Sequence, residues 1–246
     1  MSGHSKWATI KHAKGAADAK RGQMFTKLIK EISIAARMGG GNAEGNPRLR
    51  TAVLKARGAN MPKDNIDRAI KKGTGELEGV NYEELVYEAY APGGVAIFIE
   101  VLTDNKNRAA ADIRNILTRA GGQLATSGSV SRLFKRQGIV TLDGAKYTED
   151  AVMEAAIDGG AEDVSLDDGV IEVTSSPEDF ESVLNALEAK KFETMSAEIS
   201  MVAEAEVTLE NEGVSKVLRL VERLEENDDV QNVYTNIGIP EGFEEE

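Results

Sequence analysis

The chain has 246 residues, no cysteine and a formal net charge of −13. The missing cysteines exclude disulfides and thiolate metal sites, and no apolar stretch is long enough for an ordinary membrane-spanning helix. The length favours several small domains over one core, and the N-terminus has no apolar stretch typical of a secretory signal. We therefore expect a multidomain cytoplasmic protein that contacts no membrane.

Charge is divided unevenly along the chain. The first 72 residues contain 16 Lys and Arg against 5 Asp and Glu, a net charge of +11, and the remainder carries −24. Each Lys or Arg that neutralises a phosphate releases condensed counterions, so a cationic head predicts binding to a polyanion. The acidic remainder would repel phosphate and is expected to serve protein partners or orientation.

The head begins with a basic arm, residues 1–21, that has few large apolar side chains. From Phe25 to Ala36 apolar residues recur at helical spacing, which predicts a helix that ends at the glycines 39–41. The side of this helix away from the apolar stripe carries three cations that we expect to project outward: Lys27, Lys30 and Arg37.

Two shorter helices follow and complete a helical domain predicted at residues 22–78. Asn46-Pro47 supplies a cap and a proline for the first turn of the second helix, whose apolar stripe has cations on both flanks. The third helix starts at Met61-Pro62 and ends at 71–73, where two lysines precede a glycine. A domain of this size has only marginal stability alone, so we expect it to pack against another part of the chain.

The rest of the chain shows the patterns of mixed α and β structure. We predict strands at 85–91 and 95–102, a helix at 107–120 and a strand near 130–134. Residues 139–209 then read as strand, helix, two strands joined by a turn at 167–169, helix and strand, which is the ferredoxin-like order. A helix at 214–224, a strand at 230–237 and an acidic tail at 241–246 complete the chain.

Nothing in these elements has the pattern of a catalytic or metal centre. The two histidines, His4 and His12, lie in the arm, where no fixed set of neighbours can hold them. The glycines 39–41 lack the Lys and Ser/Thr of a phosphate loop, and the aspartates near 163–168 lack the spacing of a calcium loop. The prediction is a protein that is not an enzyme and has no catalytic residue, metal or cofactor; an enzyme built on the loop 104–108 is the least favoured alternative.

The predicted nucleic-acid-binding residues are the cations of the arm and of the helix faces, together with one aromatic residue that either stacks on a base or packs against the head. They are Lys6, Trp7, Lys11, His12, Lys14, Lys20, Arg21, Lys27, Lys30, Arg37, Arg48, Arg50, Lys55 and Arg57. In the loop 104–108, Lys106 and Arg108 make either a supplementary phosphate contact or only part of a capped helix start.

Several motifs resemble one protein family. They are Gly3-His4-Ser5-Lys6-Trp7, Asp18-Ala19-Lys20-Arg21-Gly22, Asn46-Pro47-Arg48-Leu49-Arg50, Asn60-Met61-Pro62, Pro92-Gly93-Gly94, Asp104-Asn105-Lys106-Asn107-Arg108 and Gly128-Ser129-Val130. Together they resemble the YebC/PmpR family, which has mitochondrial members that include the translational activator of cytochrome c oxidase subunit one. The resemblance extends to Phe134 by motif and beyond it by length and element order.

The resemblance implies an α+β multidomain fold: an N-terminal three-helix domain and two α/β domains of ferredoxin-like type, one inserted in the other. The middle domain would comprise 79–134 and 206–240, and the inserted domain 135–205. Family members are described as probable DNA-binding transcriptional regulators, and others act in translation at the ribosome. A non-enzymatic regulator that binds duplex DNA is therefore the first hypothesis, and a translation factor that binds ribosomal RNA is the alternative. Target sequence, regulated genes and oligomeric state are left open.

Overall fold

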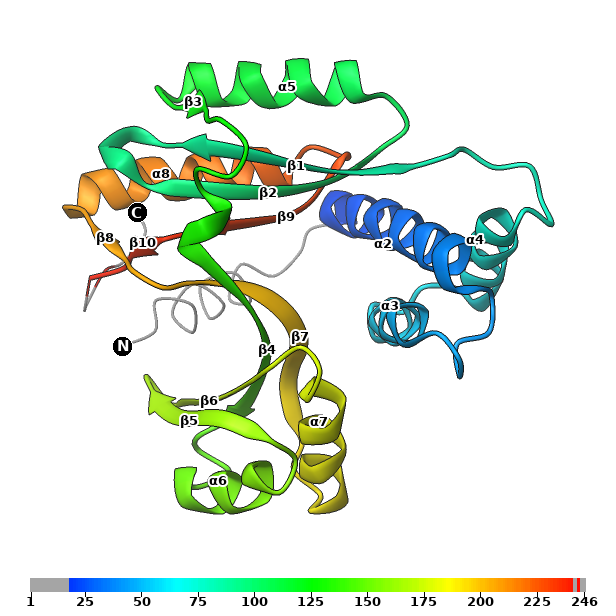
Figure 1. Ribbon diagram of the computed structural model, residues 1–246, viewed down its shortest axis with the longest axis vertical. Coiled ribbons are helices and arrows are strands. Elements are labelled where there is room, and N and C mark those ends of the chain that lie inside the picture. Colours follow the sequence, from blue (N-terminus) through cyan, green and yellow to red (C-terminus); the bar gives the residue numbers. More distant parts are fainter. Residues whose placement is uncertain (1–17, 241–242, 244–246) are drawn as a thin grey trace. The chain divides into compact units, whose positions relative to one another are not determined.

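The computed structural model describes residues 18–240 and 243, and the described chain divides into two compact units (Figure 1). One unit, here called the head unit, contains residues 18–127 and 215–233. The other, called the inserted unit, contains residues 128–214 and 234–240. A helical region and two sheet-containing parts confirm the predicted α+β multidomain fold. The exact domain bounds, including an arm that ends at residue 21, stay predictions.

Three helices make the N-terminal part of the head unit: α2 (Asp18–Gly39), α3 (Pro47–Gly58) and α4 (Lys63–Thr74). The predicted cap is confirmed, because the Asn46 side chain accepts a hydrogen bond from the Leu49 N–H at 3.1 Å. The apolar stripes of the three helices meet in one core. Its members include Ile32, Leu49, Ala52, Val53, Ala56, Ile66 and Ala69.

The third helix runs past its predicted end at Gly73 and stops at Gly75, which adopts the left-handed conformation with φ of 83°. Gly73 instead serves helix packing. A Cβ atom at this position would lie 2.2 Å from the Ser33 carbonyl oxygen of α2. The missing side chain therefore lets α4 approach α2 closely, and the Ser33 hydroxyl donates to the Ala69 carbonyl across the same contact at 3.0 Å.

We expect Gly73→Ala to lower the free energy of unfolding by about 2 kcal/mol, because the new methyl group overlaps backbone that has no room to shift. Gly58→Ala is the matched control. An added Cβ there meets nothing within 4 Å, so alanine should stabilise α3 by up to about 1 kcal/mol through helix propensity. Urea denaturation of both variants checks this, and equal effects would contradict the packing role of Gly73.

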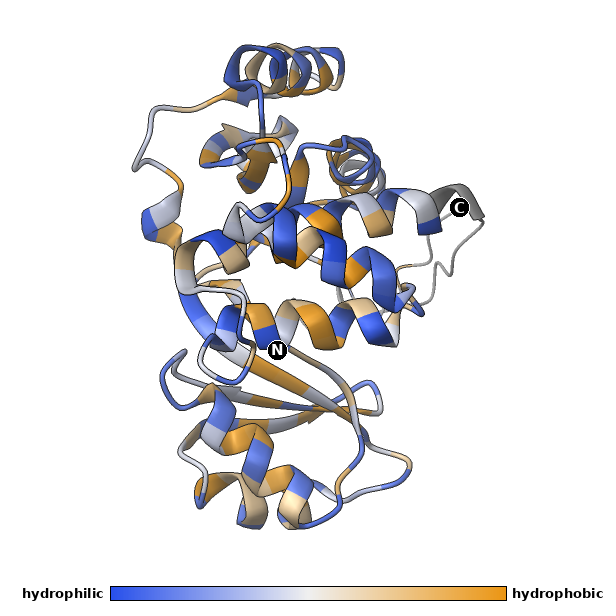
Figure 2. Ribbon diagram, turned by 90° about the vertical axis from the view of Figure 1, so that its right-hand side faces the viewer, coloured by the Kyte–Doolittle hydropathy of each residue, from blue (hydrophilic) through white to orange (hydrophobic). Residues whose placement is uncertain are grey.

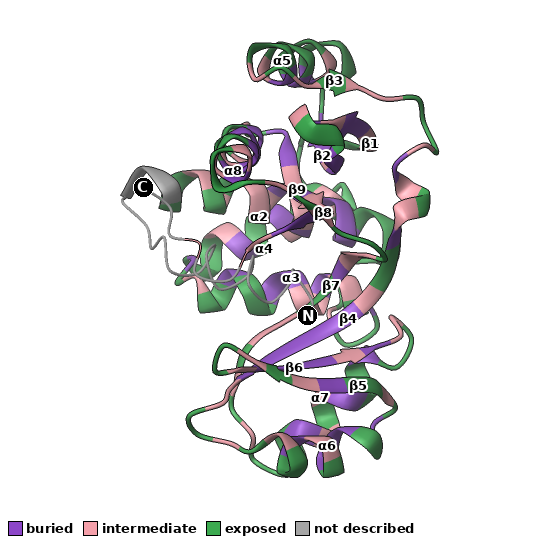
Figure 3. Ribbon diagram, turned by 90° about the vertical axis from the view of Figure 1, so that its left-hand side faces the viewer, coloured by how far each residue is buried: buried purple, intermediate pink, exposed green. Residues whose placement is uncertain are grey.

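The head unit also holds a four-stranded sheet in the order β3-β1-β2-β9. Its strands are β1 (Glu83–Tyr90), β2 (Ala96–Thr103), β3 (Gln123–Leu124) and β9 (Val230–Thr235). The helices α5 (Lys106–Arg119) and α8 (Asn211–Glu225) lie on the same side of this sheet (Figure 3). Since β9 joins strands more than 100 residues earlier in the sequence, the chain leaves this sheet and returns to it, as the insertion requires.

The inserted unit contains a second four-stranded sheet in the order β5-β6-β4-β7. Its elements follow the chain as β4 (Phe134–Asp143), α6 (Glu149–Ile157), β5 (Ala161–Asp167), β6 (Val170–Ser175), α7 (Phe180–Ala189) and β7 (Thr194–Ala203). This is the predicted ferredoxin-like order. The turn at Asp168-Gly169 is confirmed, with φ of 48° and 79° in the two-residue loop. Along the helices, hydrophobic and hydrophilic residues alternate with the helical repeat (Figure 2).

Some predicted elements were wrong in place or extent. Residues 131–133 form a short 3-10 helix where a strand was predicted near 130–134, and the strand predicted to begin at 139 starts earlier, at Phe134, and runs to Asp143. The long strand predicted to end at 209 is interrupted after Ala203 and resumes as β8 (Val207–Thr208), which pairs in parallel with β10 (Ile237–Gly238). The first helix starts at Asp18, inside the range predicted for the arm.

Candidate nucleic-acid interface

Part of the predicted interface lies outside the described residues. This applies to Lys6, Trp7, Lys11, His12 and Lys14, and also to the side chain of Lys20. The remaining predicted cations all belong to the head unit, where their contacts can be compared one by one.

Lys30 does not project outward as predicted. Its side chain is 8% exposed, and its Nζ lies 2.7 Å from Asp229 Oδ1 in the turn before β9. The ammonium also donates to the carbonyl oxygens of Asp228 at 2.8 Å and Leu102 at 3.3 Å, and it lies 5.5 Å from the centre of the Tyr82 ring. All of its donors are satisfied inside the unit, so Lys30 is a structural residue that holds α2 against the sheet.

Arg108 meets the same carboxylate from the other side. Its guanidinium donates to Asp229 Oδ2 at 2.8 Å and 3.2 Å, and to Asp104 at 2.7 Å. The neighbouring Lys106 pairs with Glu83 at 2.7 Å. The helix-cap interpretation of this loop is confirmed, because the Asn105 side chain accepts from the Arg108 N–H. Both cations face carboxylates of the head unit, which weakens the case for a phosphate contact there.

Asp229 is 5% exposed at its side chain and stays ionised because two cations meet it. Burial alone would raise its pKa, but the hydrogen bonds from Lys30 and Arg108 outweigh that effect and hold the pKa below its ordinary value. We name Lys30, Asp229 and Arg108 the Asp229 anchor.

The lowered pKa predicts how stability changes with pH. A carboxyl group whose pKa is depressed in the folded state stabilises that state above its unfolded pKa of about 3.9, and the contribution is lost as pH falls through the folded value. We expect the free energy of unfolding to decrease as pH falls below about 4. In Asp229→Asn this part of the decrease should be missing. Urea denaturation between pH 2 and 6, roughly the range in which carboxyls titrate, measures the difference, and parallel curves would contradict it.

Lys27 is likewise used inside the unit. Its Nζ donates to the Glu225 carbonyl oxygen at 2.6 Å, and the Gln23 amide donates to the carbonyl oxygen of Glu226. These carbonyls lie at the C-terminal end of α8, where helix dipoles favour a positive charge. The helical part therefore packs against another part of the chain, as its small size predicted.

The contacts of Lys27 and Lys30 show that α2 buries a second face in addition to its apolar stripe, and the sequence contains a signal for it. Gln23, Lys27, Lys30, Ile34 and Arg37 recur at the spacing of one helix face. Ile34 is the fourth of these five residues and is only 2% exposed. An isoleucine among polar and cationic residues indicates that this helix face packs against another part of the protein. The amino-acid sequence alone therefore contains the signal.

Three other predicted cations also have intramolecular partners. Arg37 is exposed, but its guanidinium donates to the Tyr82 carbonyl oxygen. Arg48 is half-buried and makes a two-bond contact with Glu31, at 2.7 Å and 3.1 Å, while it also pairs with Glu84. Arg50 donates to the Glu44 carbonyl oxygen at 3.2 Å. These contacts order the helical part and compete with any phosphate for the same donors.

The exposed cations of the helical part lie mainly on α3 and α4. Lys55 and Arg57 of α3 are exposed as predicted, and Arg21 of α2 is exposed as well. The prediction missed four cations on or at the start of α4 that are also exposed: Lys63, Arg68, Lys71 and Lys72. Arg68 and Lys72 are four residues apart and share one helix face. We call Lys55, Arg57, Lys63, Arg68, Lys71 and Lys72 the α3–α4 basic surface.

Two further observations concern the described residues only. No group of three or more His, Asp or Glu side chains among residues 18–240 and 243 is placed to hold a metal ion. In the same part of the chain, none of the helices has the length and apolar character needed to cross a bilayer.

The fold and the site together define a class: an α+β multidomain protein in which a small helical part with exposed cations is anchored to one of two four-stranded sheets. Comparison with known proteins then gives the family. Residues 5–76 match the TACO1/YebC protein N-terminal domain, and residues 82–237 match the TACO1/YebC second and third domain. The chain belongs to the TACO1/YebC family, which confirms the resemblance found in the sequence.

Several relatives are similar over nearly their whole length. A protein of Treponema denticola named "Probable transcriptional regulatory protein" is 65% identical, with 99% of both chains covered. A protein of Treponema pallidum with the same name is 63% identical over 98% of both chains. The crystal structure of a conserved hypothetical protein from Aquifex aeolicus superimposes with a TM-score of 0.84 at 45% identity, and covers 93% of this chain and 95% of that one.

Proposed function

We propose that this chain is a non-enzymatic regulatory protein that binds nucleic acid through its basic arm and the α3–α4 basic surface, with duplex DNA as the target in transcription. The observation that carries the proposal is the separation of charge: the first 72 residues carry +11 and the rest carries −24. The names of the relatives, probable transcriptional regulatory proteins, support a regulatory role.

The structure narrows which cations take part in this proposal. Lys27 and Lys30 donate to groups of the head unit, so they are removed from the proposed interface. The α3–α4 basic surface replaces them, because its side chains are exposed on one compact helical part. Arg21, Lys55 and Arg57 stay in the interface as proposed, together with the arm cations Lys6, Lys11, Lys14 and Lys20.

The alternative function is that of a translation factor that binds ribosomal RNA. A set of exposed cations on helices neutralises the phosphates of an irregular RNA as well as those of a duplex, and Trp7 in the arm suits an unpaired base. The acidic remainder of the chain is proposed to contact protein partners or to orient the complex. A cytoplasmic location accords with either target.

One experiment separates the two targets. The protein is crosslinked in growing cells, and the attached nucleic acid is sequenced. Recovery of chromosomal DNA supports the first proposal, whereas recovery of ribosomal RNA with little DNA would replace it with the alternative. A companion titration of purified protein with duplex DNA should show affinity that falls steeply with salt concentration. Binding that does not depend on salt would refute the electrostatic basis of both functions.

A further inference from the structure

One face of α3 packs in the helical core, and the opposite face points away from that core. The buried residues of this helix are Leu49, Ala52, Val53 and Ala56. On the opposite side, positions 47, 51, 54 and 58 follow one another at the spacing of a single helix face. We call this set the α3 outer face: Pro47, Thr51, Leu54 and Gly58. None of its four side chains carries a charge.

Leu54 lies near the middle of the α3 outer face and is 58% exposed. The core of the helical part does not include it, because the apolar stripe of α3 lies on the other side. A lysine or glutamine at this position would favour the helix about as well as leucine does. The helix itself therefore does not require an apolar residue here, and Leu54 offers apolar area that a ligand can cover.

Gly58 follows one turn later on the same face, and no contact within the described part of the chain requires a glycine there. Glycine disfavours a helix relative to alanine, yet a Cβ atom at Gly58 would meet nothing within 4 Å. The left-handed residue after the helix is Asn60, with φ of 59°, so Gly58 does not supply that conformation. A glycine lets a ligand approach the backbone closely, so Leu54 stands beside an open stretch of helix.

Cations border the α3 outer face on both sides. Lys55 lies about 100° around the helix from Leu54 in one direction, and Arg57 lies about 60° from it in the other. Both cationic side chains are exposed. The face is therefore an uncharged strip between two positive flanks.

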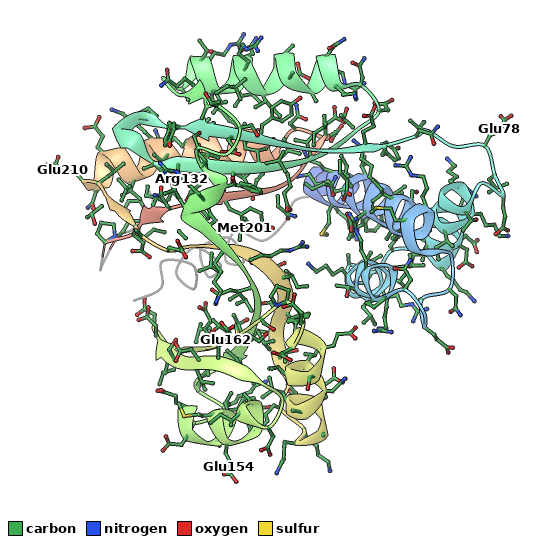
Figure 4. All side chains as sticks on the ribbon, viewed as in Figure 1. Glu78, Arg132, Glu154, Glu162, Met201 and Glu210 are labelled. Atoms are coloured by element: carbon green, nitrogen blue, oxygen red, sulfur yellow. The ribbon has the colours of Figure 1, made fainter. Side chains whose placement is uncertain are left out.

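Carboxylates do not offset these cations within α3, which contains no Asp or Glu. Glu31 and Glu84 pair with Arg48. In the described helical part, the exposed carboxylates lie outside α3, on Glu44, Asp64 and Asp67. Glu78 lies well apart from α3, in the loop between α4 and β1 (Figure 4). The charge of the α3 outer face and its flanks is thus complementary to a polyanion.

We propose that the α3 outer face enters the major groove of duplex DNA, with Leu54 against thymine methyl groups and with Lys55 and Arg57 at the phosphates on the two sides. The inference rests on the proposed function and names the element that reads the bases. The major groove of B-DNA is about 12 Å wide and admits an α-helix, and the thymine methyl group is exposed in it. Phosphates border the groove on both sides, as the cations border the face.

The same pattern favours DNA over double-stranded RNA. The major groove of an RNA duplex is too deep and narrow for side chains to read, so a helix with an apolar centre and cationic flanks finds no matching site there. An unpaired RNA strand has no second row of phosphates for the second flank.

Replacing thymine by uracil tests the contact, because uracil lacks only the methyl group. A pool of mixed-sequence duplexes is prepared with either base, and fluorescence anisotropy measures binding of the protein to each pool. The natural protein should prefer the thymine pool by about fourfold for each methyl group that Leu54 covers. Leu54→Ala should bind the two pools equally. Ile157→Ala is the matched control, since Ile157 is 60% exposed on α6, and it should keep the preference.

Gly58→Gln tests the close approach of the backbone. The new side chain is uncharged and extends into space that the protein leaves open, so the free energy of unfolding should not fall. Affinity for the thymine pool should nevertheless fall about tenfold, because the side chain holds the helix away from the groove.

Equal affinity of the natural protein for the two pools would overturn the inference. A thymine preference that Leu54→Ala retains, or unchanged affinity in a folded Gly58→Gln variant, would overturn it as well. These results would leave the proposed function standing as long as binding to duplex DNA falls steeply with salt. A natural protein that binds neither pool would instead refute duplex DNA as the target.

Discussion

Reversing the charge of two neighbouring side chains on α4, in the double variant Arg68→Glu with Lys72→Glu, is expected to weaken nucleic-acid binding by about tenfold or more at low salt. Both side chains are exposed and lie on the same face of the helix. The slope of log affinity against log salt should fall in magnitude by about 2, because two phosphate contacts are lost. Preference among sequences should not change, since contacts to phosphate carry no base information.

The matched control reverses two cations elsewhere in the head unit. Arg219 and Arg223 of α8 are exposed and are also four residues apart, so Arg219→Glu with Arg223→Glu changes the net charge by the same amount. Fluorescence anisotropy with one labelled duplex over a series of salt concentrations measures both variants. If the α8 variant loses as much affinity as the α4 variant, binding follows net charge alone and the α3–α4 basic surface is not the interface.

The second large effect is expected in the Asp229 anchor. Asp229→Ala removes the carboxylate that both Lys30 and Arg108 contact, and leaves the Lys30 ammonium buried without a counter-charge. Breaking a buried pair in this way costs about 3 kcal/mol of unfolding free energy. Asp104→Ala removes a partner of Arg108 that is exposed at the surface, and should cost less than about 1 kcal/mol.

A second substitution shows whether the cost comes from the unpaired ammonium. Lys30→Met keeps the length of the side chain and removes its charge, so the double variant Lys30→Met with Asp229→Ala should be more stable than Asp229→Ala alone. The folded Lys30→Met protein should also bind nucleic acid as the natural protein does. Loss of binding in a folded Lys30→Met variant would return Lys30 to the interface and contradict its structural role.

Sequence reasoning was reliable where local rules decide the structure. The cap at Asn46, the turn at Asp168-Gly169 and the ferredoxin-like order each depend on residues close together in the sequence, and the structure has all three. The helix end predicted at Gly73 was wrong because glycine fits two roles. A glycine can end a helix, and it can also let two helices approach closely; only the position of Ser33 on α2 decides between them.

The site was harder to predict because a charge pattern shows where cations lie but not what they contact. Lys30 and Asp229 are 199 residues apart, and no local rule pairs them. The cations of α4 were overlooked for the opposite reason. Lys71 and Lys72 were interpreted only as part of the end of that helix, whereas their exposure on the folded helical part makes them part of a surface.

The Asp229 anchor also sets an order of events during synthesis. The cations of the first 72 residues leave the ribosome before Asp229, whose carboxylate holds Lys30 and lies 199 residues further along the chain. Domains generally fold as they emerge, N-terminal parts first, so the nascent helical part waits for the last strand of its sheet before it is fixed. A chain that terminates before residue 229 would carry the entire cationic surface without its anchor. Correct positioning of that surface therefore requires synthesis to have passed residue 229.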